Sequence, residues 1–158
     1  MISRISAFLN GLVDEAPARA LGDADLKIAC AALLVHCAAA DGKHSPAEDA
    51  KLREILARKF ELSGKDADEI IETATRQQQD AVDLHRFTRV LHKHLDRDAR
   101  KRTVRALWEM ANADGTIDAE ERTLVSVTAQ LLDVEGHDAV ALRQAVEAAS
   151  RRVRAEQS

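Results

Sequence analysis

The chain carries the same acidic unit twice, and this internal repeat limits the folds that are open to it. The tripeptide Ala-Asp-Gly at 40–42 recurs at 113–115, a separation of 73 residues. Each copy follows an apolar, alanine-rich stretch, and each is followed by a residue that readily caps a helix, Ser45 or Asp118. The repeated unit is therefore a helix, a tight acidic turn and a second helix.

The similarity between the copies continues beyond the second helix of the unit. Segment 60–70, FELSGKDADEI, matches segment 132–142, LDVEGHDAVAL, at a separation of 72 residues. The second copy thus loses one residue within the helix that follows the cap. Two copies are too few for a solenoid, so we expect the two halves to pack on each other.

Helical spacing of apolar residues predicts the fold class. Pro46 directly after Ser45, with Glu48 three residues beyond the cap, is typical of a helix start. Abundant alanine with only six Gly and two Pro favours helix over strand. We predict an all-α protein, a single domain of 7–8 helices in two pseudo-symmetric halves, in which the helices cover approximately 2–12, 23–40, 45–60, 63–78, 83–95, 96–111, 118–132 and 137–150.

The predicted boundaries divide the chain into three parts. Residues 1–20 form an N-terminal amphipathic helix and linker, residues 21–150 form the helical domain, and residues 151–158 form a basic tail. The last helix is expected to fray into this tail. Val127 and Val140 are expected on the apolar faces of the last two helices.

Composition and motifs exclude several functions. A net charge of −4 and a pI of about 5.9 argue against nucleic-acid binding. No apolar run could span a bilayer and the N-terminus lacks a secretory signal, so the expected location is the cytoplasm. The nucleophile elbow, the P-loop, the dinucleotide fingerprint and the HExxH motif are all missing, which predicts a non-enzymatic protein.

The cysteines and basic residues have simple structural interpretations. Cys30 and Cys37 lie seven residues apart on one predicted helix, about 10 Å, which is too far for a disulfide. We expect both thiols to be buried. Arg97, Lys101 and Arg105 recur every four residues and predict a solvated face, with an acidic partner or an anionic membrane surface as the alternative.

Two aspartates in the acidic turns are placed unfavourably. Asp41 and Asp114 sit where a helix ends, so their carboxylates meet the negative pole of the helix dipole. Such a placement costs about 0.3–1 kcal/mol. A bound cation could offset this cost, and so could hydrogen bonds from backbone amides of the turn.

Carboxylates near the two turns are candidate ligands for a divalent cation. All-oxygen surroundings suit Ca²⁺ or Mg²⁺ better than Zn²⁺, although the EF-hand spacing is not met. In the alternative interpretation these residues only cap helices and brace the turns. No organic cofactor is expected. The candidate ligands are Asp41 and Glu48 in the first copy, and Asp114, Asp118, Glu120 and Glu121 in the second.

The paired Ala-Asp-Gly turns, each between an apolar helix and a capped acidic helix, resemble the tellurite-resistance TerB family. The stretch DLHRFTRVLHKHLDRDARKRTVRALWEMANADGTIDAEE is especially similar to an uncharacterised bacterial branch of it. The resemblance extends over residues 26–148. The fold is also similar to the N-terminal domain of a DnaJ-type membrane co-chaperone.

The resemblance implies about seven helices and acidic residues that bind divalent cations. By position, these residues are Asp41 and Glu48 in the first copy and Asp114 and Glu121 in the second, with Glu120 as a competitor for Glu121. The first copy departs from the family pattern, because Lys43 and His44 replace residues that are usually acidic and apolar. The second turn is therefore the stronger candidate.

Two functional hypotheses follow. In the first, the chain binds partner proteins in stress or envelope-linked signalling, and a cation at the acidic turns stiffens or switches it. In the second, it is a purely structural scaffold without a metal. Protein partners are expected in both, and peripheral membrane association or a small homo-oligomer is left open.

Overall fold

The computed structural model describes Ile5, Phe8 and Leu9 and residues 23–39, 46–62, 64–76, 81–112 and 119–157. Seven helices account for almost all of these residues, which confirms the all-α prediction. They are α2 (Asp23–Ala39), α3 (Pro46–Phe60), α4 (Lys65–Arg76), α5 (Ala81–His94), α6 (Arg97–Ala111), α7 (Ala119–Leu131) and α8 (His137–Gln157).

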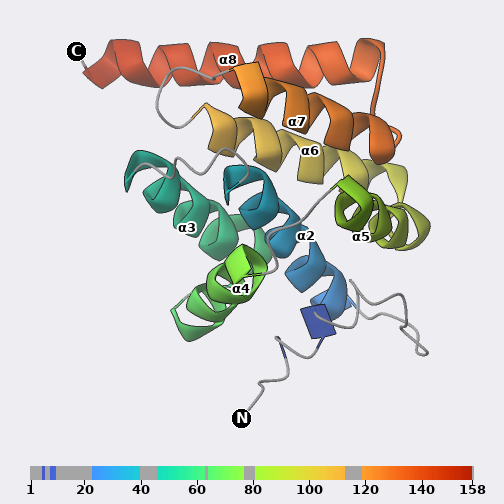
Figure 1. Cartoon of the computed structure of the whole chain (residues 1–158). Helices are drawn as coiled ribbons and strands as arrows, with labels where there is room; N and C mark the ends of the chain where they lie inside the picture. The colour runs from blue at the N-terminus through green and yellow to red at the C-terminus, as the bar shows by residue number, and fades with distance from the viewer. Residues whose placement is uncertain are drawn as a thin grey trace.

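The packing of the helices follows the sequence repeat (Figure 1). In the first half α2 packs on α3 and α4, and in the second half α6 packs on α7 and α8. Across the halves, α2 contacts α7 and α3 contacts α6, while α2 and α6 contact each other. The equivalent helices therefore exchange equivalent contacts, as a pseudo-twofold axis between α2 and α6 requires.

One pair of side chains lies close to this axis. Thr103 Oγ1 hydrogen-bonds with Cys30 Sγ at 3.4 Å, and these two residues are 73 positions apart. They are therefore the same position of the repeat. Equivalent positions meet only where a twofold axis passes between them, so the contact marks the axis at the crossing of α2 and α6.

The single-residue offset of the repeat is absorbed at the end of α3. Leu62 donates its backbone N–H to Leu56 O, six residues back, at 2.9 Å. Val134 donates to Ala129 O, five residues back, at 2.8 Å. The same two positions are thus joined in each copy, and the extra residue of the first copy widens the last turn of α3.

The core is largest around α2. Seven consecutive residues of this helix, 29–35, are buried, because five other helices pack around it. The sequence predicts burial only along one apolar stripe of α2. In the structure the small alanines beside this stripe are buried as well. Ile5, Phe8 and Leu9 are helical as predicted, and Leu9 is fully buried in the same core.

Three local predictions differ from the structure. Val127 and Val140 are exposed, at 39% and 54%. The faces of α7 and α8 that pack on the core are therefore narrower than the positions of their apolar residues predict. The prediction that the last helix frays near residue 150 is wrong, since α8 continues to Gln157. Its C-terminal end projects beyond the neighbouring helices (Figure 1).

Candidate functional site

The acidic turns join α2 to α3 and α6 to α7. Three of the predicted ligands, Asp41, Asp114 and Asp118, lie outside the described residues, as do the caps that precede α3 and α7. The two glutamates in the first turns of these helices are described, so the site is built from Glu48 and Glu121 outward.

Both glutamates are buried, which is unusual for a carboxylate. Glu48 is 7% exposed and Glu121 is 4% exposed, and they occupy the same position of the repeat. Burying a carboxylate costs free energy unless hydrogen bonds, a cation or a charged partner compensates for the lost water. Each copy therefore holds a compensated acid at the base of its acidic turn.

The structure also distinguishes the two adjacent glutamates of the second copy. Glu120 is exposed, like its counterpart Ala47 in the first copy, whereas Glu121 is buried like Glu48. Glu121 is therefore the structural equivalent of Glu48, and the one-residue offset has not yet occurred at this point of the chain. Ligation by either residue remains a prediction.

Carboxylate oxygens, such as those of Glu48 and Glu121, are suitable ligands for a hard cation such as Ca²⁺ or Mg²⁺. Within the described residues, however, no three His, Cys, Asp or Glu side chains come together in a way that could hold a metal ion. A complete cation site at either turn would need the aspartates that flank the described helices, together with Glu48 or Glu121.

The two cysteines are free and buried, as predicted. Burial raises the pKa of the Cys30 thiol to about 11 and that of the Cys37 thiol to about 12, although hydrogen bonds to Thr103 and Thr128 oppose the shift. Both thiols are therefore protonated at neutral pH. A protonated, buried thiol is a poor nucleophile and a poor metal ligand.

The described histidines give no metal cluster either. His85, His92 and His94 of α5 are all exposed. His36 lies on α2 and is mostly buried. It is not among the residues to which the sequence assigned a role. Burial lowers the pKa of His36 to about 4, so this imidazole is neutral at pH 7. The sequence feature that could have identified His36 as buried is its position among the apolar residues of the predicted helix.

The basic stripe of α6 is largely neutralised by acids of the same domain. Arg97 and Lys101 pair with Asp138 of α8 at 2.6 and 3.3 Å, and their hydrogen bonds lower the pKa of that carboxyl. Arg105 pairs with Glu109 at 3.2 Å. These ion pairs support the interpretation as a solvated face and weaken the alternative that the stripe contacts an acidic partner or an anionic membrane surface.

These features define an all-α domain made from a duplicated helical unit, with a buried glutamate at the same place in each copy. A family model described as Tellurite resistance protein TerB matches residues 27–144, and the chain belongs to the TerB family. The predicted resemblance is thus confirmed over most of its extent. No curated protein and no solved structure matches the chain significantly. None of the described helices is both long enough and apolar enough to cross a membrane.

Proposed function

We propose that this chain is a non-enzymatic, cytoplasmic module that binds partner proteins in stress or envelope-linked signalling and takes up Ca²⁺ or Mg²⁺ at its two acidic turns. The observation that carries the proposal is the burial of Glu48 and Glu121 at equivalent positions, each in the first turn after an Asp-Gly sequence. A buried acid next to a second acid is stable when a divalent cation neutralises both.

Cation binding at these turns would affect helices that lie at the interface between the two halves. The first turn enters α3, which contacts α6 of the other half, and the second enters α7, which contacts α2. A cation that tightens either turn therefore acts on a helix that bridges both halves. Such coupling lets a ligand shift the balance between packing arrangements of the domain.

A scaffold without a metal is the second candidate, and the helix starts favour it. Glu48 follows Pro46 by two residues and Glu121 follows Ala119 by two, which is the position from which a glutamate reaches back to cap its helix. In that case each carboxylate is compensated by backbone N–H groups, and the acidic turns bind no ion.

Chemical unfolding with and without cations separates the two candidates. The protein is unfolded in urea with EDTA, and then with excess Ca²⁺, Mg²⁺ or Zn²⁺. A specific ion at one hundred times its dissociation constant should raise the free energy of unfolding by about 2.7 kcal/mol. We expect this gain with Ca²⁺ or Mg²⁺, and we expect Glu121→Gln to reduce it.

Glu135→Gln is the matched control, because it removes the same charge from an exposed position between α7 and α8 that is not a predicted ligand. It should leave the cation effect almost unchanged. Equal loss in both variants would mean that general negative charge, and not a site, attracts the ion. If no ion alters unfolding of the unmodified protein, the cation proposal is wrong and the scaffold candidate stands.

A further inference from the structure

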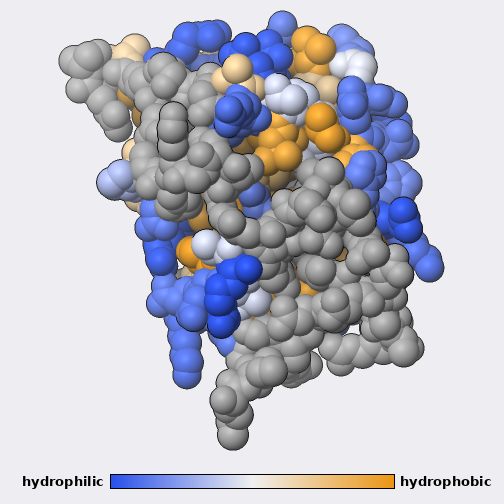
Figure 2. Space-filling model, viewed as in Figure 1, coloured by the Kyte–Doolittle hydropathy of each residue, from blue (hydrophilic) through white to orange (hydrophobic). Residues whose placement is uncertain are grey.

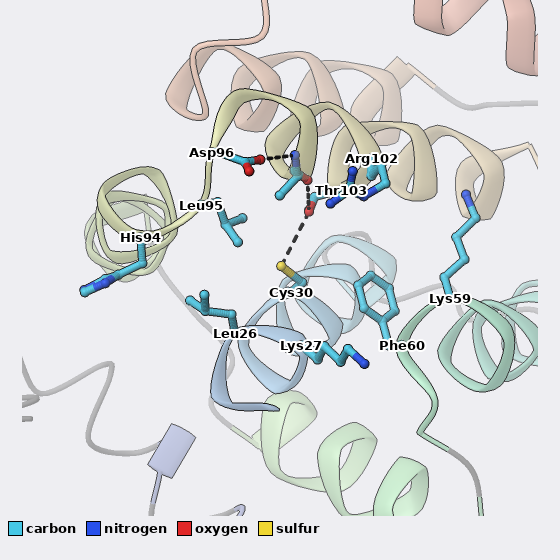
Figure 3. A pocket seen from close by; sticks show the side chains of 11 residues that line it. Leu26, Lys27, Cys30, Lys59, Phe60, His94, Leu95, Asp96, Arg102 and Thr103 are labelled. Carbon is cyan, nitrogen blue, oxygen red and sulfur yellow. Dashed lines mark hydrogen bonds between the residues drawn. The ribbon is translucent and has the colours of Figure 1, made fainter. Parts of the chain in front are cut away.

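A pocket lies at the crossing of α2 and α6, lined by residues from the N-terminal parts of both helices (Figure 3). Its volume is about 580 Å³, which is within the range of small-molecule sites. The two buried residues among those that line it are Cys30 and Thr103, the pair close to the pseudo-twofold axis. The described residues that line it come from α2, the end of α3, the α5–α6 link and α6, and they are Leu26, Lys27, Cys30, Lys59, Phe60, His94, Leu95, Asp96, Ala99, Arg102 and Thr103.

The walls of the pocket are apolar but not fully covered. Leu26, Phe60 and Leu95 are each partly exposed there, although Phe60 and Leu95 also pack against the core. At the base, Cys30 and Thr103 hydrogen-bond with each other, and Thr103 also donates to Ala99 O at 2.9 Å. The base thus has little hydrogen-bonding capacity left for a ligand, and the surroundings favour an apolar group.

The charged residues around the pocket are mostly basic. Lys27, Lys59 and Arg102 contribute three cations, whereas Asp96 is the single carboxylate among the lining residues that the structure describes. Asp96 accepts a hydrogen bond from Ala99 N at 2.8 Å as the cap of α6, so it is already engaged. Among the described lining residues, cations therefore outnumber carboxylates.

The three cations differ in their availability. Lys27 pairs with Glu61 at 3.3 Å, and Lys59 pairs with Glu109 at 3.1 Å. Arg102 has no ion pair among the described residues, in contrast to Arg97, Lys101 and Arg105 of the same helix. Burial raises the pKa of the Cys30 thiol at the base of the pocket, and the positive charge of Arg102 partly opposes this effect. Arg102 is the cation best placed to bind an incoming anion.

We infer that this pocket binds a small amphipathic anion, in which Arg102 pairs with a carboxylate, sulfonate or phosphate and the partly exposed apolar walls hold a ring or short alkyl chain. A guanidinium forms two parallel hydrogen bonds with such an oxyanion. The apolar walls would lose contact with water when the ligand enters. This site goes beyond the proposed function and does not depend on cation binding.

The test uses 8-anilinonaphthalene-1-sulfonate, a fluorescent amphipathic anion, with the folded full-length chain. We expect saturable binding of one probe per chain, with displacement by octanoate. Arg102→Gln should weaken binding about tenfold, since it removes one charge-assisted pair. Arg122→Gln is the control, because Arg122 is also an exposed arginine and lies on α7, outside the pocket.

A second variant tests the apolar wall. Leu26→Glu places a carboxylate in the pocket and should abolish probe binding, whereas Val140→Glu, at an exposed position of α8, should not. Circular dichroism checks that both variants keep their helices. If Leu26→Glu unfolds, Arg102→Gln still decides the outcome.

Four results would overturn the inference. The first is the absence of saturable binding, and the second is equal affinity in the unmodified protein and Arg102→Gln. The third is displacement by octanol as effective as by octanoate, since the anion would then be unnecessary. The fourth is displacement by inorganic phosphate alone at the same concentration, since the apolar group would then contribute nothing.

Discussion

One position of the repeat shows how residues with different chemistry are accommodated in the two halves. His36 of α2 corresponds to Glu109 of α6. Burial raises the pKa of Glu109, but hydrogen bonds from Lys59 and Arg105 outweigh this effect, and the net pKa is lowered. His36 is instead kept neutral by burial. The first copy thus holds a neutral base at the position where the second holds a half-buried, paired acid.

The buried imidazole predicts a dependence of stability on pH. The pKa of His36 falls from 6.5 in the unfolded chain to about 4 in the folded protein, so the unfolded chain binds the proton first as pH falls. Stability contributed by neutral His36 is complete above pH 6.5 and is lost between pH 6.5 and 4. The loss should reach about 3 kcal/mol at the lower end.

Urea unfolding at several pH values between 7 and 4 measures this loss. His36→Gln should flatten the curve in that interval, whereas His85→Gln, at an exposed position, should leave it unchanged. If the His36→Gln protein lost the same stability as the unmodified protein on acidification, another group would be responsible.

At the scale of elements, the backbone conformation that follows α3 is repeated after α7. Glu61, which follows α3, is in the left-handed region at a φ of 58°, and the corresponding residue after α7, Asp133, has a φ of 61°. The glycines at the third position beyond them, Gly64 and Gly136, have φ values of 58° and 67°. Each copy therefore enters its last helix through two left-handed residues.

These glycines predict equal effects in the two halves. Gly64→Ala and Gly136→Ala should each lower the free energy of unfolding by about 1–2 kcal/mol, because a Cβ disfavours positive φ. No neighbouring atom would clash with the added carbon, so the cost is conformational alone. Thermal unfolding measures it, and Gly64→Asn, which tolerates this region better, should cost less. A much larger cost in one copy would show that the two loops are not equivalent.

At the scale of the molecule, the halves have no separate cores. α2 contacts α6 and α7, and α3 contacts α6, so helices of the two halves pack directly on each other. One cluster contains buried residues from both copies, including Leu34 and its counterpart Leu107. On the face shown in Figure 2, the coloured residues are mainly hydrophilic, with smaller apolar patches between them. The two halves should therefore unfold together.

Leu34→Ala tests this cooperativity, because Trp108, the single tryptophan, belongs to the other half. The substitution empties space in a fully buried site and should lower stability by about 2–5 kcal/mol. The fluorescence of Trp108 and the helical circular dichroism should shift to the same lower urea midpoint. Val153→Ala, at an exposed position, should change stability by less than about 0.5 kcal/mol. A tryptophan transition unaffected by Leu34→Ala would mean that the halves unfold separately.

Local chemistry in the sequence determined most of the helical architecture. The helix starts at Pro46 and after Asp96 depend on interactions between residues close in the chain. The spacing of apolar residues and the repeat of 73 positions are patterns of the sequence itself. The same repeat predicted equivalent acids, and the burial of Glu48 and Glu121 agrees with that equivalence. The aspartates of the candidate site lie outside the described residues, so their role remains a prediction.

Only the tertiary structure decided which faces are covered and which residues from distant helices meet. The burial of α2 on all sides depends on five partners, and the exposure of Val127 and Val140 depends on where the core ends. The pairing of Arg97 with Asp138, and the gathering of Leu26, Phe60 and Arg102 around one pocket, join segments far apart in sequence. The sequence determined the elements because helix formation is local, whereas the pocket and its unpaired charge arise from the angles at which those elements cross.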